Sequence, residues 1–377
     1  TGPSVKKDGS YNSIIKTARS EIVDRNGYTI ATNLKTASVY ANPKEILDIE
    51  EAVNSLSTAV PDLDATGLLV DFDRDTKFVW VKRHISPKEQ KSINDLGIPG
   101  IYFTEDIKRV YPHENLLSHV LGYVDIDNKG LAGIEREFDE LLSWGSDDPL
   151  QLSIDLKIQH ILRDELAKQM IGYDAIGAAG MVMDVKTGEV IAMVSLPDFN
   201  SNNPKIATTE QKFNRITQAA YEMGSTIKPI TAAMALDYGV ANLNSSYDAT
   251  KPLKYAKHTI NDYHAKNRVL SLPEVIMYSS NIGSAKMARR VGPKRQQEFL
   301  KKVGMFDKTE IELPEKSKPL IPSTWREINT MTISFGHGIA VSPAHIAKAF
   351  CSLVNGGSLH PTTLLKKKPG DIIESKK

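Results

Sequence analysis

The chain has 377 residues, of which 41% are hydrophobic and 25% are charged, and its formal net charge at pH 7 is +1. These values are typical of a folded protein with about two domains, and the balanced charge gives no reason to expect a nucleic-acid partner. The single cysteine excludes a disulfide within the chain and a cysteine-based zinc site. The sequence contains no apolar run of about 18 residues, so it predicts neither a membrane span nor a signal peptide.

The first part of the chain is predicted to be a mixed module of short helices and strands. Alternating residues around Asn26-Gly27 predict two short strands within residues 21–41, because Asn-Gly supplies the positive φ of a tight turn. Further elements are expected in this order: a helix over 43–57, a strand over 78–81, a helix starting at Ser86-Pro87, a strand and loop over 101–124, and a short helix over 130–139. This half contains no nucleophile beside a base, so we interpret it as a support or interaction module.

A domain boundary is predicted at residues 144–149, where Trp-Gly-Ser-Asp-Asp-Pro gathers turn formers. It divides the chain into an N-terminal domain, 1–148, and a C-terminal domain, 149–377. The first helix expected beyond the boundary covers residues 156–170 and is amphipathic. Its apolar face contains Ile158, Ile161, Leu162 and Leu166.

Two apolar strands follow, over residues 179–185 and 189–196, joined by Lys186-Thr187-Gly188. A long apolar helix is then expected to begin close to Ser225. Pro229 supports this start, because proline lacks an amide hydrogen and is tolerated only near the beginning of a helix.

Ser225 and Lys228 stand three positions apart at the front of this helix, so their side chains can face the same cleft. A neutral lysine amine there can take the serine proton and make an acylatable nucleophile without histidine. Free N–H groups at a helix start can also stabilise a developing oxyanion. The spacing alone is common, however, and it equally fits a capping serine beside a solvated lysine.

A second motif, Tyr278-Ser279-Ser280-Asn281, is predicted to lie on a turn between two helices. By itself it fits a helix cap made by Ser280 or Asn281. Beside the first motif it fits a catalytic element, in which Ser279 relays a proton to the leaving group and Asn281 donates to the substrate amide. Ser280 is a further candidate for substrate binding. Asn214 is a candidate for ordering water or groups near Lys228, or has a structural role.

Together these residues resemble the active-site serine penicillin-recognising enzymes, whose motifs are S-x-x-K, S-x-N and a later K-T-G. The resemblance extends to the class B penicillin-binding proteins, and among them to the division-specific transpeptidases. Residues 19–27 are similar to the opening of that family, and residues 130–135 resemble its pedestal segment. Its transpeptidase half is matched at residues 213–215, 224–229 and 335–343.

The resemblance implies an α+β fold, in which a serine β-lactamase/transpeptidase-like domain with an antiparallel sheet flanked by helices follows a mixed α+β pedestal. It also implies a peptidoglycan D,D-transpeptidase of septal wall synthesis, which acylates Ser225 with a D-Ala-D-Ala stem peptide, binds β-lactams and needs no cofactor or metal. The implied partners are a glycosyltransferase and other division proteins. The implied location is the periplasmic face of the bacterial inner membrane, with an anchoring N-terminal helix outside this chain.

Two other functions remain open. A β-lactamase or D,D-carboxypeptidase would use the same two motifs with water as the acceptor, although such a hydrolase needs no pedestal. A divisome scaffold or β-lactam sensor would keep the fold and need no catalysis.

The third family motif is where the chain departs from the pattern. Lys186-Thr187-Gly188 precedes Ser225 and lies between two predicted strands, so we interpret it as a plain turn. Lys368-Pro369-Gly370 has the right order, but Pro369 has no amide hydrogen to donate to a substrate. We therefore expect the C-terminal domain to lack the strand that carries this motif, and the natural protein to contain further residues. His337, between two glycines, is expected to shape a turn.

Overall fold

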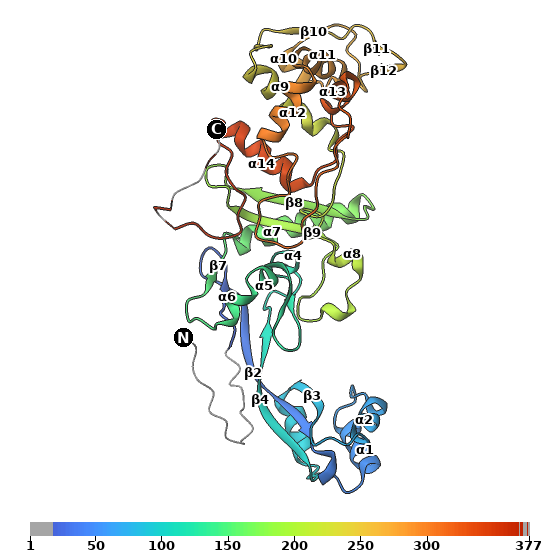
Figure 1. Ribbon diagram of the computed structural model, residues 1–377, viewed down its shortest axis with the longest axis vertical. Helices are drawn as coiled ribbons and strands as arrows, with labels where there is room; N and C mark the ends of the chain where they lie inside the picture. Colours follow the sequence, from blue (N-terminus) through green and yellow to red (C-terminus); the bar gives the residue numbers. More distant parts are fainter. Residues whose placement is uncertain (1–17, 369, 372–374, 376–377) are drawn as a thin grey trace.

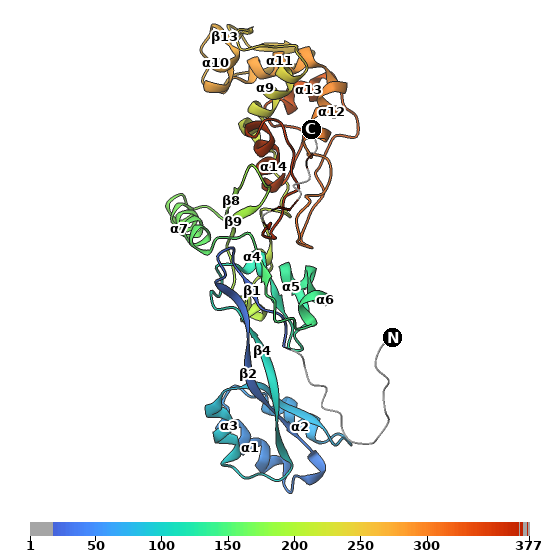
Figure 2. The ribbon, with the colours of Figure 1, turned by 90° about the vertical axis from the view of Figure 1, so that its left-hand side faces the viewer.

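The computed structural model describes residues 18–368, 370, 371 and 375, which form an elongated body (Figure 1). Pro369 lies outside the described residues. The segment 43–100 lies at one end of the body and a group of C-terminal helices lies at the other, and Figure 2 shows the same arrangement from the side. Within the described part, no helix is long and apolar enough to cross a membrane.

One five-stranded sheet organises the N-terminal part, with strand order β3-β2-β1-β7 and β4 also paired with β2. The strands are β1 (Ile22–Val23), β2 (Thr29–Ala41), β3 (Val79–Ile85), β4 (Ile101–Val110) and β7 (Leu150–Gln151). The other elements of this part are η1 (Pro43–Glu45), α1 (Ile49–Ala59), α2 (Ala65–Phe72), α3 (Pro87–Asn94), α4 (Ser118–Leu121), β5 (Tyr123–Val124), β6 (Gly130–Ala132), α5 (Gly133–Glu137) and α6 (Asp139–Ser143).

The antiparallel hairpin predicted around Asn26-Gly27 is confirmed, since β1 pairs antiparallel with β2 and Gly27 has a φ of 88°. Its second strand is not short. β2 runs for 13 residues, and ten consecutive pairs join it to β4, from Thr32 opposite Val110 to Ala41 opposite Ile101. This long ribbon connects the part of the sheet formed by β1 and β7 to the end where α1, α2 and α3 lie (Figures 1 and 2).

The helix predicted over 43–57 begins later than expected. A short 3-10 turn, η1, comes first, and α1 begins only after Asp48, whose side chain accepts a hydrogen bond from the Glu51 amide at 2.9 Å. Ile46 therefore precedes the helix. The start at Ser86 is confirmed, because Ser86 and Glu89 form a capping box at α3. The segment 101–124 contains a helix, α4, that the sequence did not predict, and residues 130–139 contain β6 as well as helix.

A buried ion-pair cluster ties the segment before β1 to α5 and β4. Glu135 has no exposed side-chain surface, and its carboxylate lies 2.9 Å from Arg19 Nη2 and 2.7 Å from Arg109 Nε. Both guanidinium groups are buried as well. A carboxylate shared by two buried arginines neutralises charges that would otherwise be expensive to remove from water.

Replacing Glu135 by alanine is expected to reduce the free energy of unfolding by about 3–5 kcal/mol, because buried Arg109 loses its counterion and buried Arg19 keeps only Asp139. Denaturant unfolding followed by circular dichroism measures the change. Glu137→Ala, an exposed position of the same helix, is the matched control and should shift the free energy by no more than about 0.5 kcal/mol. Equal effects of the two substitutions would contradict a structural role for the cluster.

The C-terminal part contains a two-stranded antiparallel sheet and a group of helices above it. The sheet is β8 (Ala178–Met183) paired with β9 (Val190–Leu196). The remaining elements are α7 (Leu156–Gly172), η2 (Pro204–Ile206), α8 (Thr209–Lys212), η3 (Gly224–Ile227), α9 (Lys228–Asp237), β10 (Ser246–Asp248), β11 (Leu253–Tyr255), β12 (His258–Ile260), β13 (Val269–Ser271), α10 (Leu272–Met277), α11 (Asn281–Val291), α12 (Pro293–Lys302), α13 (Glu327–Ile333) and α14 (Pro343–Val354).

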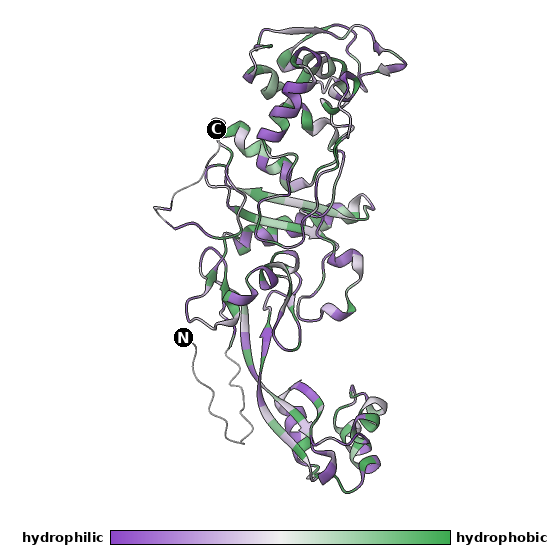
Figure 3. Cartoon of the chain, viewed as in Figure 1, coloured by the Kyte–Doolittle hydropathy of each residue, from purple (hydrophilic) through white to green (hydrophobic). Residues whose placement is uncertain are grey.

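The sheet lies between two helices, α7 and α14, which both contact it (Figure 2). Every residue of β9 is buried, and the strand appears as a continuous apolar segment in Figure 3. Antiparallel sheets flanked by helices were expected from the family resemblance, and this is confirmed. The exception is β7, which pairs parallel with β1.

The predicted apolar face of α7 is confirmed for Leu162 and Leu166, which are half-buried against Gly180 of β8, and is wrong for the other two residues. Ile158 and Ile161 are 38% and 60% exposed, whereas Gln159 is buried. The Gln159 amide donates to the carbonyl oxygens of Leu116 and Met193 at 2.9 and 2.8 Å. A polar side chain can replace an apolar one in the interior where it satisfies backbone groups that would otherwise be unpaired.

Candidate active site

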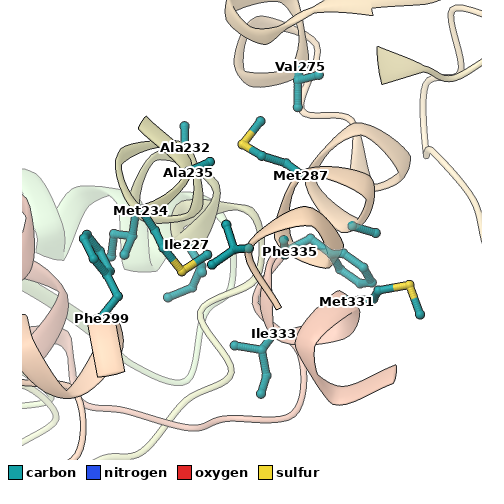
Figure 4. Packing of buried hydrophobic residues seen from close by; sticks show 14 of the residues in the cluster. Ile227, Ala232, Met234, Ala235, Val275, Met287, Phe299, Met331, Ile333 and Phe335 are labelled. Atoms are coloured by element: carbon teal, nitrogen blue, oxygen red, sulfur yellow. The ribbon is translucent and has the colours of Figure 1, made fainter. Parts of the chain in front are cut away.

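Ser225 lies in η3, immediately before α9, where the sequence placed the start of an apolar helix. Pro229 is in the first turn of α9, as predicted. Ile227 and Ile230 are buried in the apolar cluster that surrounds α9 and α11, part of which is shown in Figure 4. This packing holds the turn in place, so that Ser225 is exposed while Lys228 is only 2% exposed.

Lys228 joins the two predicted motifs. Its Nζ donates to Ser225 Oγ at 2.9 Å and to Ser279 Oγ at 2.8 Å. A third bond, of 2.6 Å, goes to the Ser279 carbonyl oxygen. The amine therefore lies between two hydroxyl groups that come from segments about fifty residues apart in the chain. This is the geometry that a proton transfer between a nucleophile and a second hydroxyl requires.

Burial lowers the pKa of Lys228 from 10.5 to about 8, and the negative charge of Asp262 acts in the opposite direction. Removing an ammonium group from water disfavours its charged form, which explains the direction. At pH 7 about a tenth of the amine is then neutral and able to accept a proton, compared with less than about one part in a thousand for an ordinary lysine. Lys228 is thus a base near neutral pH.

Ser279 lies on the turn between α10 and α11, as predicted, and it is exposed. Its φ is 55°, in the left-handed region that a residue other than glycine seldom adopts. Such conformations persist where the surrounding structure holds them, and they are frequent at functional sites. In this conformation both oxygens of Ser279 reach the Lys228 amine.

Ser280 and Asn281 have different positions on the same turn. Ser280 is buried and caps α11, since its hydroxyl oxygen accepts from the Gly283 amide at 2.9 Å. The structure therefore gives Ser280 the capping role instead of the substrate contact proposed from the sequence. Asn281 is half-buried, and its amide donates to the Asn261 carbonyl oxygen at 2.9 Å. It borders a cavity of about 340 Å³ that Thr332 and Phe335 also line.

Asn214 is not brought to Lys228. It is buried, and its side chain donates to the His119 carbonyl oxygen and accepts from the Ile216 amide at 3.0 Å. It lines a second cavity, of about 190 Å³, together with Gly133 from the N-terminal part and Glu315. Its contacts support the structural role that the sequence left open.

The turn interpretation of Lys186-Thr187-Gly188 is confirmed. These residues connect β8 to β9, Gly188 has a φ of 77°, and the Lys186 amide donates to the Asp184 carboxylate at 2.8 Å. The expectation for His337 is also confirmed, because both flanking glycines have positive φ and the His337 amide closes a turn onto the Thr332 carbonyl oxygen at 3.1 Å.

A glycine contact supports the turn that carries Ser225. The Gly224 amide donates to the Gly336 carbonyl oxygen at 3.2 Å. A Cβ added to Gly336 would lie 2.0 Å from the Gly224 carbonyl oxygen, and the φ of Gly336 is 92°. Only glycine allows the two backbones to approach so closely.

Gly336→Ala is expected to slow acylation of Ser225 by a β-lactam at least about tenfold, because the added methyl group displaces Gly224 and misplaces the nucleophile. Stopped-flow fluorescence or quenched mass spectrometry measures the rate. Gly357→Ala is a matched control, since Gly357 has the same φ of 92° and nothing within 4 Å of an added Cβ. A similar loss in both variants would show that backbone strain, and not displacement of Ser225, is responsible.

Two residues at the site were missed from the sequence. Asp262 accepts from the Ser280 hydroxyl at 2.7 Å and from the Ile282 amide at 2.9 Å. Glu222 accepts from the Gly338 amide at 2.7 Å. Asp262 belongs to no motif and is 18 residues from Ser280 in the chain, so only the fold reveals it. Glu222 adjoins the first motif, but its partner is 116 positions away.

Comparisons with known proteins agree with this geometry. Residues 178–376 match the penicillin binding protein transpeptidase domain, and residues 14–148 match the penicillin-binding protein dimerisation domain. The chain is 40% identical over 365 residues to the probable peptidoglycan D,D-transpeptidase FtsI of Caulobacter vibrioides, covering 96% of this chain and 62% of that protein.

More distant relatives bear similar names. The probable peptidoglycan D,D-transpeptidase PenA of Neisseria meningitidis is 31% identical, and the peptidoglycan D,D-transpeptidase FtsI of Escherichia coli is 28% identical. Both alignments cover 96% of this chain and 68% of the relative. The chain thus spans about two thirds of the length of these relatives, and slightly less of the Caulobacter protein.

Proposed function

This chain belongs to the class B penicillin-binding proteins, and from that premise we propose that it is a peptidoglycan D,D-transpeptidase of septal wall synthesis. The observation that carries the proposal is the position of the buried Lys228 amine, 2.9 Å from the exposed Ser225 hydroxyl and 2.8 Å from the Ser279 hydroxyl. A serine with a near-neutral amine as its base performs acyl transfer.

Acylation begins when neutral Lys228 takes the proton of Ser225 as Oγ bonds to the carbonyl carbon between the two D-alanines of a stem peptide. The Ser225 amide at the helix start stabilises the oxyanion, and Asn281 donates to the peptide. The tetrahedral intermediate collapses by breaking the carbon–nitrogen bond. Ser279 passes the proton from Lys228 to the departing nitrogen, which releases D-alanine and leaves an ester on Ser225.

The ester is resolved by the amine of a second stem peptide, whose proton returns through the same hydroxyl and amine. A β-lactam follows the first half of this sequence, because its strained amide opens onto Ser225. Its leaving nitrogen remains tethered to the acyl group and stays near the ester. Access for the acceptor amine is then reduced, and the acyl-enzyme is long-lived.

The domain bounds, the location and the partners in this proposal are inferred from the family. We infer an N-terminal pedestal over residues 1–148 and a transpeptidase domain over 149–377. We also infer a location at the periplasmic face of the inner membrane, and action beside a glycosyltransferase and other division proteins. Ser280 and Asn214 contribute by holding α11 and the junction between the two parts.

The proposal is tested with a synthetic pentapeptide donor and an excess of an amine acceptor, using the full-length natural protein. Transfer to the amine should exceed hydrolysis, as measured by mass spectrometry of the two products. Hydrolysis as the dominant reaction would favour a carboxypeptidase or β-lactamase, and absence of any acyl-enzyme would favour a scaffold or sensor. Benzylpenicillin turnover separates a β-lactamase, which hydrolyses the antibiotic, from a carboxypeptidase.

A further inference from the structure

The segment after β12 contacts the Ser279–Asn281 turn at three points. The Asp262 carboxylate accepts from the Ser280 hydroxyl through Oδ2 at 2.7 Å and from the Ile282 amide through Oδ1 at 2.9 Å. Beside it, the Asn261 carbonyl oxygen accepts from the Asn281 side chain at 2.9 Å. The α11 side of the turn is therefore held from outside its own helix pair.

This support matters because the turn includes a strained residue. Ser279 has a φ of 55°, in the left-handed region that is unfavourable for a residue with a side chain. Asp262 holds Ser280 and Ile282, the first and third residues after Ser279. The backbone amides of Ser279 and Ser280 bond to α10, so Asp262 supplies the support on the α11 side that helps both Ser279 oxygens meet the Lys228 amine.

Asp262 also acts on Lys228 through its charge. Its negative charge lies at the N-terminus of α11, which favours an anion. Its charge raises the pKa of Lys228, against the stronger effect of burial. A base must keep enough affinity for the proton that it removes, so this charge offsets part of the loss caused by burial.

We propose that Asp262 is a positioning residue for the acylation step, which holds the Ser279–Asn281 turn against Lys228 and places a negative charge at the start of α11. The proposal rests on the function proposed above. It separates two contributions of one carboxylate, a geometric one through Ser280 and Ile282 and an electrostatic one on Lys228.

The test compares the pH dependence of penicillin acylation in three variants. Asp262→Asn should lower the maximal rate at least about tenfold and move the acidic midpoint down by about 0.5 to 1 pH unit. Ser280→Ala keeps the carboxylate and removes two hydrogen bonds, the one to Asp262 and the cap on the Gly283 amide, so its rate should fall without a shift of the midpoint. Asp248→Asn, an exposed carboxylate on β10, is the control and should change neither.

A second readout does not depend on acylation. In a Ser225→Ala background, the ε-carbon resonance of Lys228, assigned through Lys228→Arg, reports its titration directly by NMR. Asp262→Asn should lower this midpoint by the same amount, even if the protein never reacts with penicillin. Asp262→Ser, which lacks the charge, replaces Asp262→Asn if the latter does not fold. An unchanged NMR midpoint, or an unchanged rate in a protein that does acylate, would overturn the proposal.

Discussion

We expect the protein to form a covalent adduct with benzylpenicillin, and Ser225→Ala to abolish that adduct while leaving the free energy of unfolding within about 0.5 kcal/mol. The first effect follows because the acyl group has no oxygen to bond to. The second follows because Ser225 is exposed and its hydroxyl is joined to the protein by one bond, from Lys228. Intact-mass spectrometry after incubation measures the adduct, and chemical denaturation measures stability.

Thr226→Ala is the matched control for this substitution. Thr226 is the exposed neighbour of Ser225, and its hydroxyl bonds only locally, to the Met223 carbonyl oxygen at 2.7 Å. This variant should acquire one adduct, located on the peptide that contains Ser225. An adduct that persists in Ser225→Ala, or that disappears in Thr226→Ala, would mean that another group is the nucleophile.

Lys228→Met lowers the rate of acylation by about 10²–10⁴, the usual contribution of a general base. Methionine fills a similar volume at this buried position but accepts no proton. Lys228→Arg is the informative companion, because a guanidinium keeps a positive charge and hydrogen bonds yet stays protonated at all working pH values. Equal losses in both variants identify proton acceptance as the missing property, whereas recovery in the arginine variant would contradict it.

The same Lys228→Met variant also tests the pKa of Lys228 through the pH dependence of the free energy of unfolding. The folded pKa of Lys228 is about 8 and the reference value is 10.5, so between these values the unfolded chain binds a proton that the folded chain does not. The unsubstituted protein therefore gains about 3 kcal/mol relative to the variant as pH rises from 8 to 10.5, and this contribution is lost again as pH falls. Unfolding free energies of both proteins at pH 7 and pH 10 test the sign. A difference that does not depend on pH would contradict the lowered pKa.

The parts of the fold and of the site that could be predicted from sequence are those whose geometry depends on neighbouring residues. The turn at Asn26-Gly27, the capping box at Ser86 and the helix start before Pro229 each depend on side chains within a few positions. Their geometry is decided by local sterics and hydrogen bonds, so a short pattern is sufficient. The same is true of the turn after Tyr278.

What could not be predicted depends on distant segments. Gln159 is buried, while Ile158 is exposed, because backbone groups near residues 116 and 193 need a donor at that point. Asn214 lies beside the N-terminal part instead of beside Lys228 because its partner is the His119 carbonyl oxygen. Asp262 has no pattern of its own. Periodicity and motif spacing contain no information about such partners, which the tertiary fold alone brings together.

The ribbon of β2 and β4 has a consequence for the length of the molecule. Its ten residue pairs correspond to about 30 Å of strand, so the number of residues in the ribbon sets the distance between α1 and the end of the sheet formed by β1 and β7. Removing two opposed pairs shortens this spacer by about 7 Å and keeps Val39 facing the helices. Removing one residue from β2 alone turns Val39 outward and Tyr40 inward. Evolution can therefore adjust the reach of the protein only in steps of two residues, unless a bulge absorbs the odd one.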